Sequence, residues 1–374
     1  MIKARSARIE EFEKVVELIN KVFRTTRGHE PTMQQEFPLL INKNNVENMV
    51  IVEKEQEIVS DVNYLIQDVL VQGTKVKVAS IGGVCTDPKH ERKGYASKIL
   101  DYVEKKLYEE GVEVLLISGN RTLYTRRMCS RVKNFYKYTI KPEDIILDLC
   151  IEEYDEKYLN QMINRYHQSS TRYVRTKEQF KMLLKAGTIP WGTYTYKKLV
   201  IKKEDKLIGY MVIRLIDEEK RRGEIIELNI PNHYVRDIIA HIAYQYDLND
   251  VDYWVHVKDT QNHLENYDEV NIDDLHGTIK IIHYEKLCKS LYDYFVQYVE
   301  QELLDHMEFK DLDVGYLMKY KNEAFFIKDV EKLNQLFFAG LVDEKELEGK
   351  TNIENFIRSV FPLPFIWPAN LNYQ

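Results

Sequence analysis

The stretch DPKHERKGYASKIL, residues 87–100, joins a charged turn to an amphipathic segment through the single glycine Gly94. Where such a loop leads into a helix, free backbone N–H groups and the positive end of the helix dipole lie together and bind anions. Gly94 has no Cβ, so a phosphate can approach the backbone, and Arg92 and Lys93 add positive charge. The stretch predicts a pyrophosphate site. The alternative is a glycine that only closes a turn, with its charged neighbours in solvent.

The chain lacks the two commonest phosphate-binding motifs. Neither G-x-x-x-x-G-K-[ST] nor G-x-G-x-x-G occurs in the sequence. These motifs mark P-loop nucleotide sites and Rossmann dinucleotide sites. The phosphate that residues 87–100 would bind therefore belongs to another kind of carrier.

Composition limits the partners. A net charge of −7 argues against general affinity for nucleic acid and favours cationic small molecules. No signal peptide opens the chain and no apolar run is long enough to span a membrane, so we expect a cytoplasmic protein without a membrane partner. The cysteines lack the spacing of a zinc site, so we expect reduced thiols and no metal. They are Cys85, Cys129, Cys150 and Cys288.

Apolar spacing predicts the order of elements in the first part of the chain. A helix over 8–24 precedes a three-stranded meander within 49–86, an amphipathic helix over 94–110 and a buried strand over 112–118. A meander, a helix and a strand recur over 198–257. This recurrence favours a diverged tandem duplication. The alternative is that the β-β-β-α-β order is simply common in α/β proteins.

The last part of the chain has a different character. A length of 374 residues already predicts two or three domains. From residue 276 the pattern indicates a short strand over 277–282, a long helix over 285–304 and a helix over 329–338. The final segment, FPLPFIWPANLNYQ, contains three prolines and many apolar residues. We expect it to dock on the protein as an extended segment.

The loop and its surroundings resemble the GNAT superfamily of acetyl-CoA-dependent N-acetyltransferases, whose core motif is (Q/R)-x-x-G-x-(G/A). Gly94 and Ala96 fill the last two motif positions, and Glu91 stands where the family usually has Gln or Arg. The resemblance implies acetyl-CoA as co-substrate. It implies that the backbone of a splayed strand binds the pantetheine arm and that the loop, with Asn120 nearby, binds the phosphates. The residues implied are Val84, Cys85, Thr86, Arg92, Lys93, Gly94, Tyr95, Ala96, Ser97 and Asn120.

The same resemblance implies a catalytic acid. Tyr124 follows the buried strand, where GNAT enzymes often have L-Y-x-x-x-G-(F/Y) and the tyrosine protonates the departing CoA thiolate. A phenol with a pKa near ~10 stays protonated at neutral pH and suits this role. Met128 replaces the family's glycine, and the alternative for Tyr124 is a packing role. Cys85 is expected to be a wall residue, because no base partner for a nucleophile can be placed.

In layout, the whole chain resembles the enhanced-intracellular-survival (Eis) family. This implies an α/β (α+β) fold with a catalytic GNAT domain over 1–150, a degenerate GNAT-like domain over 151–275 and a sterol-carrier-like domain with a docking tail over 276–374. The second domain reads ELNIPNHYVRD where the glycine loop would be. In that family the terminal carboxylate enters the active site, which implies a catalytic role for Gln374; the alternative is a tail that only staples the third domain.

The leading hypothesis is therefore direct acetyl transfer from acetyl-CoA to a primary amine. The family acetylates amines, including aminoglycosides and lysine side chains, and forms oligomers. We expect a small-molecule or lysine amine as acceptor, a homo-oligomer, and no nucleic-acid partner. The alternatives are a non-catalytic acyl-CoA-binding or scaffold protein and, less favoured, lipid carriage by the C-terminal domain.

Overall fold

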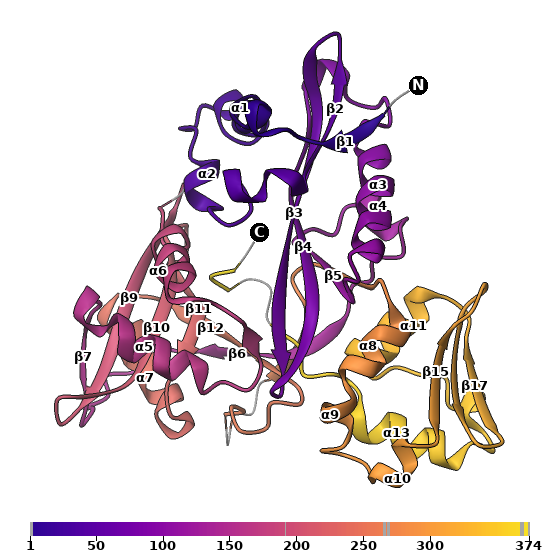
Figure 1. Cartoon of the computed structure of the whole chain (residues 1–374). Helices are drawn as coiled ribbons and strands as arrows, with labels where there is room; N and C mark the ends of the chain where they lie inside the picture. Colours follow the sequence, from indigo (N-terminus) through magenta and orange to yellow (C-terminus); the bar gives the residue numbers. More distant parts are fainter. Residues whose placement is uncertain (1–2, 191, 265–266, 268–269, 367–369, 373–374) are drawn as a thin grey trace. The chain divides into compact units, whose positions relative to one another are not determined.

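The computed structural model describes residues 3–190, 192–264, 267, 270–366 and 370–372. The chain forms two compact units. The first contains residues 1–132 and 276–363, and the second contains residues 133–275 and 364–373. Each unit holds one large mixed sheet with helices on its faces (Figure 1). The predicted α/β class is confirmed, while the three-domain division stays a prediction.

The large sheet of the first unit contains the predicted meander and buried strand. Strands β1 to β4 are antiparallel, β4 and β5 are parallel, and β14 closes the far side of β5. The spatial order is β1 (Ala4–Ser6), β2 (Met49–Lys54), β3 (Glu57–Val71), β4 (Thr74–Thr86), β5 (Val114–Ile117) and β14 (Thr278–Ile281).

Helices cover both faces of this sheet. Helices α1 and α2 lie on one side of β3 and β4, and α3 lies on the other side (Figure 1). Each of α1 and α3 buries an apolar stripe at helical spacing, as the sequence predicts. The bounds are α1 (Phe12–Phe23), α2 (Met33–Glu36), α3 (Tyr95–Glu109) and α4 (Thr122–Thr125), with short 3-10 helices η1 (Ile9–Glu11), η2 (Thr25–Arg27), η3 (Lys43–Asn48) and η4 (Pro88–His90).

The second unit repeats the element order of the first. A meander, helix α7 and a parallel strand follow one another again, and an outer helix layer precedes them. The strands in spatial order are β13 (Val270–Asp274), β6 (Lys133–Ile140), β12 (Asp250–His256), β11 (Arg222–Asn229), β10 (Lys206–Ile216), β9 (Tyr194–Lys203) and β7 (Cys150–Glu153). The remaining elements are η5 (Glu156–Tyr158), α5 (Leu159–His167), β8 (Arg172–Tyr173), α6 (Lys177–Ala186) and α7 (Asn232–Gln245).

Backbone details support the duplication. The β2–β3 turn has positive φ at Glu55 and Gln56, and the β9–β10 turn has positive φ at Glu204 and Asp205. Three residues after each turn, one residue is skipped in the pairing register, so both hairpins carry a bulge at the same place. Two halves without visible side-chain similarity thus share a backbone irregularity. The structure thus shows two units with the same strand order, as the predicted tandem repeat requires.

The C-terminal part of the first unit contains a small antiparallel sheet covered by helices. The strands are β15 (Met307–Asp311), β16 (Tyr316–Tyr320) and β17 (Glu323–Ile327). The helices are α8 (Tyr284–Ser290), α9 (Tyr292–Phe295), α10 (Gln301–Leu304), α11 (Val330–Ala339), α12 (Glu344–Leu347) and α13 (Thr351–Val360). The predicted strand over 277–282 and the predicted helix over 329–338 are confirmed, as β14 and α11. The likeness to sterol carriers stays a prediction.

The predicted long helix over 285–304 is wrong. The chain forms α8, α9 and α10 instead. Leu287, Leu291 and Phe295 are buried as the spacing predicts, but Val296 is exposed and Glu300 has an extended backbone. The apolar stripe therefore ends at Phe295, and without core contacts a helix is not held together past that point.

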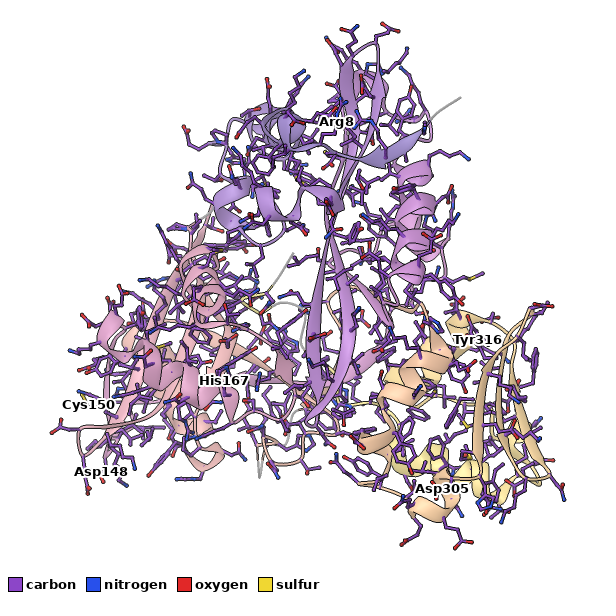
Figure 2. The ribbon with its side chains drawn as sticks, viewed as in Figure 1. Arg8, Asp148, Cys150, His167, Asp305 and Tyr316 are labelled. Atoms are coloured by element: carbon purple, nitrogen blue, oxygen red, sulfur yellow. The ribbon has the colours of Figure 1, made fainter. Side chains whose placement is uncertain are left out.

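The tail docks as an extended segment, as expected. Phe361, Leu363 and Phe365 are buried without helical structure. The Leu363 N–H donates to the Phe337 carbonyl at 2.7 Å. All four cysteines are free, and the exposed one is Cys150 at the start of β7 (Figure 2). Within the described residues, no helix is long and apolar enough to cross a membrane.

Candidate active site

Strands β4 and β5 pair over a short stretch and then diverge. Parallel pairing joins Val78–Ile81 to Val114–Ile117, and β4 continues to Thr86 with pairing recorded only to β3. Between Cys85 and Gly82 the β3 register skips, so β4 carries a bulge there, and Gly83 has φ +63°. The β5-facing edge of Gly82–Thr86 therefore offers backbone groups to a ligand instead of to a strand.

The predicted strand residues face opposite sides of the sheet. Val84 is partly buried and packs in the cluster on the α3 side, together with Tyr95 and Tyr124. Cys85 is buried in the cluster on the α1 side. Burial raises the pKa of the Cys85 thiol well above its usual value, so the group stays protonated. This agrees with a wall residue and not with a nucleophile.

The loop before α3 has the backbone that the sequence predicts. Asp87 accepts a hydrogen bond from the Lys89 N–H at 2.9 Å and pairs with Lys21 at 2.6 Å, which fixes the loop's entry. Arg92 and Gly94 both adopt left-handed backbone, with φ +59° and +78°. A Cβ placed on Gly94 would meet no protein atom within 4 Å, so the space above it is open.

This loop fits a pyrophosphate. The Lys98 N–H donates to the Gly94 carbonyl at 3.1 Å, so the preceding N–H groups at the start of α3 lie before the helical ladder. The side chains of Arg92 and Lys93 are exposed beside them. Ser97 is also exposed, Ala96 is partly buried, and Glu91 points to solvent. An open helix start flanked by two cations suits a doubly charged phosphate group.

Tyr124 lies on the short helix α4, just after β5. Its side chain is 5% exposed. A Cβ on Gly119 would lie 3.1 Å from the Tyr124 Cε2 atom, so the ring packs closely on the backbone of Gly119. Burial raises the pKa of the phenol, and Arg121 lowers it by a smaller amount. The hydroxyl is therefore a proton donor at neutral pH. Asn120, next to this turn, is exposed.

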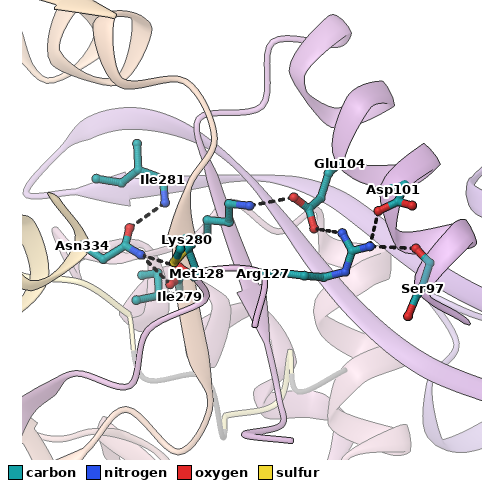
Figure 3. Close-up of polar contacts among 9 residues, drawn as sticks. All are labelled: Ser97, Asp101, Glu104, Arg127, Met128, Ile279, Lys280, Ile281 and Asn334. Atoms are coloured by element: carbon teal, nitrogen blue, oxygen red, sulfur yellow. Dashed lines mark hydrogen bonds and ion pairs between the residues drawn. The ribbon is translucent and has the colours of Figure 1, made fainter. Parts of the chain in front are cut away.

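The turn after Tyr124 is held by residues far away in the chain (Figure 3). Met128 has φ +60°, the left-handed conformation that a glycine would adopt at this position. The Asn334 Nδ2 group donates to the Met128 carbonyl at 3.1 Å and to Ser130 Oγ at 2.9 Å. Asn334 Oδ1 accepts from the Ile281 N–H at 2.9 Å. These contacts keep the turn in place although Met128 is not a glycine.

Ion pairs fix the other side of the same turn (Figure 3). Arg127 donates to Glu104 at 2.8 Å and to the Ser97 carbonyl at 2.7 Å, and it also pairs with Asp101. Lys280 on β14 pairs with the second Glu104 oxygen at 2.6 Å. The turn that carries Tyr124 is thereby tied to the first turns of α3. The positive charge of Arg127 is thus paired with carboxylates of α3.

The structure thus brings Val84, Tyr95 and Tyr124 into one cluster and places Cys85 on the opposite face. Gln374 lies outside the described residues, so its catalytic role stays a prediction. Sequence reasoning missed Asn334 and Arg127, because their partners are distant in the chain. It also missed the two polar residues Asp61 and Asn63 inside β3, which are fully buried. Their signal was visible as polar letters within the apolar run EIVSDVNYLIQ.

Comparisons with known proteins identify a domain in the part of the chain that holds this site. Residues 3–128 match the family model of the acetyltransferase (GNAT) domain. No curated protein matches the chain significantly. GNAT domains use acetyl-CoA. Within the described residues, no group of three or more His, Cys, Asp or Glu side chains could hold a metal ion.

Solved structures share the fold of the whole chain. A GCN5-related N-acetyltransferase from Anabaena variabilis is 15% identical, with a TM-score of 0.62 over 98% of this chain and 97% of that one. Eis1 from Mycobacterium abscessus is 12% identical, with a TM-score of 0.56 over 97% of each chain. A GCN5-related N-acetyltransferase from Kribbella flavida is 10% identical, with a TM-score of 0.54 over 88% and 84%. Residues 3–128 are therefore a GNAT acetyltransferase domain, in a chain with an Eis-like fold.

Proposed function

We propose that this chain is an N-acetyltransferase that moves acetyl from acetyl-CoA to a primary amine by direct attack. The acceptor is a small polyamine-like or aminoglycoside-like compound or a lysine side chain. The observation that carries the proposal is the divergence of β4 from β5 beside the open helix start at Gly94. A pantetheine arm can lie along the free edge of β4 while its phosphates lie at the start of α3.

The strand supplies positioning and polarisation. In this proposal the free backbone groups of Val84–Thr86 bind the pantetheine arm, and a backbone N–H polarises the thioester carbonyl. The phosphate contacts come from residues 92–97. Acetyl-CoA supplies the activated acyl group, so the protein has to orient the amine, remove its proton and protonate the leaving sulfur.

Tyr124 is proposed as the acid. As the amine nitrogen bonds to the acyl carbon, the carbon–sulfur bond breaks and the sulfur takes the phenol proton. Burial keeps that proton on the phenol until a thiolate develops beside it. The packing of the ring on Gly119 and the ties of the following turn hold the hydroxyl in one place.

The terminal carboxylate of Gln374 is proposed as the proton acceptor for the amine, directly or through water. A protonated amine has no lone pair, so it has to lose a proton before it attacks. This role rests on the resemblance to the Eis family, in which the terminal carboxylate enters the active site.

Thiol release tests the proposal. The protein is incubated with acetyl-CoA and a panel of amines, and free CoA thiol is measured. We expect turnover with at least one amine. Tight acetyl-CoA binding without thiol release from any amine would instead favour a non-catalytic acyl-CoA-binding protein.

Tyr124→Phe should lower kcat by about 10²–10⁴-fold, because it removes the general acid. The matched control is Tyr64→Phe in the same unit, since the Tyr64 hydroxyl is buried without a hydrogen-bond partner. Tyr64→Phe should leave kcat unchanged and stability equal or higher. Equal kcat for Tyr124→Phe and wild type, with both folded by circular dichroism, would remove Tyr124 from the mechanism.

A further inference from the structure

A groove lies in the C-terminal part of the first unit, between strand β17 and helices α11 and α12 (Figure 1). Its volume is about 370 Å³, which falls within the roughly 300–1,000 Å³ of ligand pockets in proteins. Of the described residues that line it, none belongs to the Gly94 loop or to the turn that carries Tyr124. The groove is therefore a different surface from the one proposed for acetyl transfer.

The floor of this groove is apolar. Phe325, Ile327 and Leu336 line it and are buried in the core of the unit. Val342 is partly buried beside them, and Leu341 on the wall is 62% exposed. A large apolar side chain that is exposed beside an apolar hollow is typical of a place where another molecule binds.

The rim of the groove carries four carboxylates and one lysine, which are Asp329, Glu331, Asp343, Glu346 and Lys332. Lys332 pairs with Glu346 at 2.7 Å. Glu346 raises the pKa of the Lys332 ammonium most, and Asp329 and Asp343 raise it further, so these carboxylates act on the same place. Glu331 is exposed and forms no ion pair among the described residues. Four acids against one lysine leave a surplus of three negative charges around an apolar floor.

Charge complementarity indicates the kind of occupant. A surplus of negative charge repels fatty acids and phosphates and attracts cations. Leu341 and Glu331, which would have to enclose a small ligand, are themselves exposed, whereas a small-molecule site buries most of its ligand. A partner protein brings its own cover. Arginine suits such a rim, because its guanidinium binds carboxylates in a bidentate way.

We propose that this groove binds a basic amphipathic segment of a partner protein, with apolar side chains on the floor and arginine side chains on the carboxylate rim. Laying the apolar face of a helix into an apolar groove is a common mode of recognition. The carboxylates then decide which segments bind, since an acidic segment is repelled. The proposal goes beyond acetyl transfer and does not depend on it.

Two matched peptides test the proposal by fluorescence anisotropy with the full-length chain. Each has about 14 residues, or about four helical turns, with leucine along one face. One peptide carries arginine on the other face, and the second carries glutamate there. The fluorophore blocks the N-terminal amine and neither peptide contains lysine, so neither can accept acetyl. The arginine peptide should bind at least about tenfold more tightly and should lose affinity as salt is raised.

Leu341→Asn tests the apolar wall. It should weaken binding of the arginine peptide about threefold to tenfold, because it removes apolar area but no charge. The matched control is Val314→Asn, which changes an apolar side chain that is 73% exposed and lies outside the groove. Val314→Asn should bind like wild type. Both positions are exposed, so both variants should fold, which circular dichroism checks.

Glu331→Gln tests the rim. It should weaken binding of the arginine peptide about threefold to tenfold, because the rim loses an unpaired carboxylate. The matched control is Glu302→Gln, since both glutamates lie in the first turn of a helix, α11 and α10. The two substitutions therefore remove the same charge and the same interaction with a helix dipole. Glu302→Gln should leave the affinity unchanged.

Four results would overturn the proposal. The first is equal binding of the two peptides or binding of neither, and the second is wild-type affinity in both Leu341→Asn and Glu331→Gln. The third is binding of octyltrimethylammonium without the arginine peptide, which would indicate a small-molecule site. The fourth is an oligomer that Leu341→Asn dissociates in analytical ultracentrifugation, which would mean that a second copy covers the groove. None of these measurements involves thiol release, so failure of the proposed function is read separately.

Discussion

The two units share a strand order and a bulge but differ where a ligand would bind. In both, the central parallel strands pair briefly and then diverge: β4 from β5 after Ile81, and β11 from β12 after Glu224. In the first unit the following helix starts at Gly94 with open space above it. In the second it starts after Pro231, and Asn232 Nδ2 donates to the His263 carbonyl at 3.0 Å. The divergence is common to both units, whereas the open helix start is seen in the first unit and not in the second.

In the second unit, the protein's own residues fill two places: the start of α7 and the surroundings of Glu227. His263 and the buried Leu264 lie beside the start of α7. On the other face, Arg175 binds Glu227 and donates to the tail residue Asn372 at 2.5 Å. Both places in the second unit are thus occupied by the protein's own groups.

The largest predicted effect concerns the buried ion pair between Arg175 and Glu227 in the second unit. Arg175→Met should lower the free energy of unfolding by about 3–5 kcal/mol, because Glu227 would remain buried without its partner. Urea denaturation measures the loss.

The control for this change is Arg214→Met in the same unit. Its partner Glu224 is paired through a side chain that is 28% exposed, so solvent compensates part of the loss. We expect no more than about 1 kcal/mol there. If both variants lost the same free energy of unfolding, the Arg175–Glu227 pair would be no more important than an ordinary, partly exposed ion pair.

A second prediction separates the role of Gly94 in ligand binding from the stability lost when a left-handed glycine is replaced. Gly94→Ala and Gly28→Ala change glycines of the same unit with φ +78° and +74°, and neither new Cβ meets a protein atom within 4 Å. Both should cost about 1–2 kcal/mol of stability, since both place an alanine in left-handed backbone.

Only Gly94→Ala should weaken acetyl-CoA binding, by about tenfold or more, because its methyl group enters the space proposed for the pyrophosphate. Calorimetric titration with acetyl-CoA measures this. If both substitutions changed the affinity for acetyl-CoA equally, the proposed pyrophosphate site at Gly94 would be contradicted.

Much of the fold could be predicted from local sequence patterns. The features that could not be predicted share one cause. Helix α3 and strand β5 lie within a few residues of the predicted ranges, because periodicity and a glycine mark them directly. The pairing of β14 with β5 was not predicted, since nothing local specifies a partner so distant in sequence. The loop at Gly94 could be predicted because its backbone chemistry lies in consecutive residues.

The supports of the site could not be predicted in the same way. The left-handed Met128 depends on Asn334, and the meaning of Asp61 depends on what faces it across the sheet. Both are tertiary relations between positions whose separate residue types are unremarkable.

The last prediction is a pH dependence of stability that comes from the buried carboxyl of Asp61 in the first unit. Burial raises the pKa of Asp61 well above its usual value in the folded protein. The unfolded chain therefore releases this proton at lower pH than the folded chain does. Stability from the protonated carboxyl is present below the unfolded pKa and is lost as pH rises through the folded pKa, by at most about 1.4 kcal/mol per pH unit.

Asp61→Asn has no such proton, so its stability relative to wild type should rise between pH 5 and pH 8, measured by urea denaturation. The titratable group facing Asp61 is Cys85, whose pKa burial also raises, so its thiol does not titrate in this range. A constant difference between Asp61→Asn and wild type would mean that Asp61 is already ionised and charge-compensated in the folded protein. The first unit would then hold its own counterion, like the second, and the difference between the open and the filled site would disappear at this position.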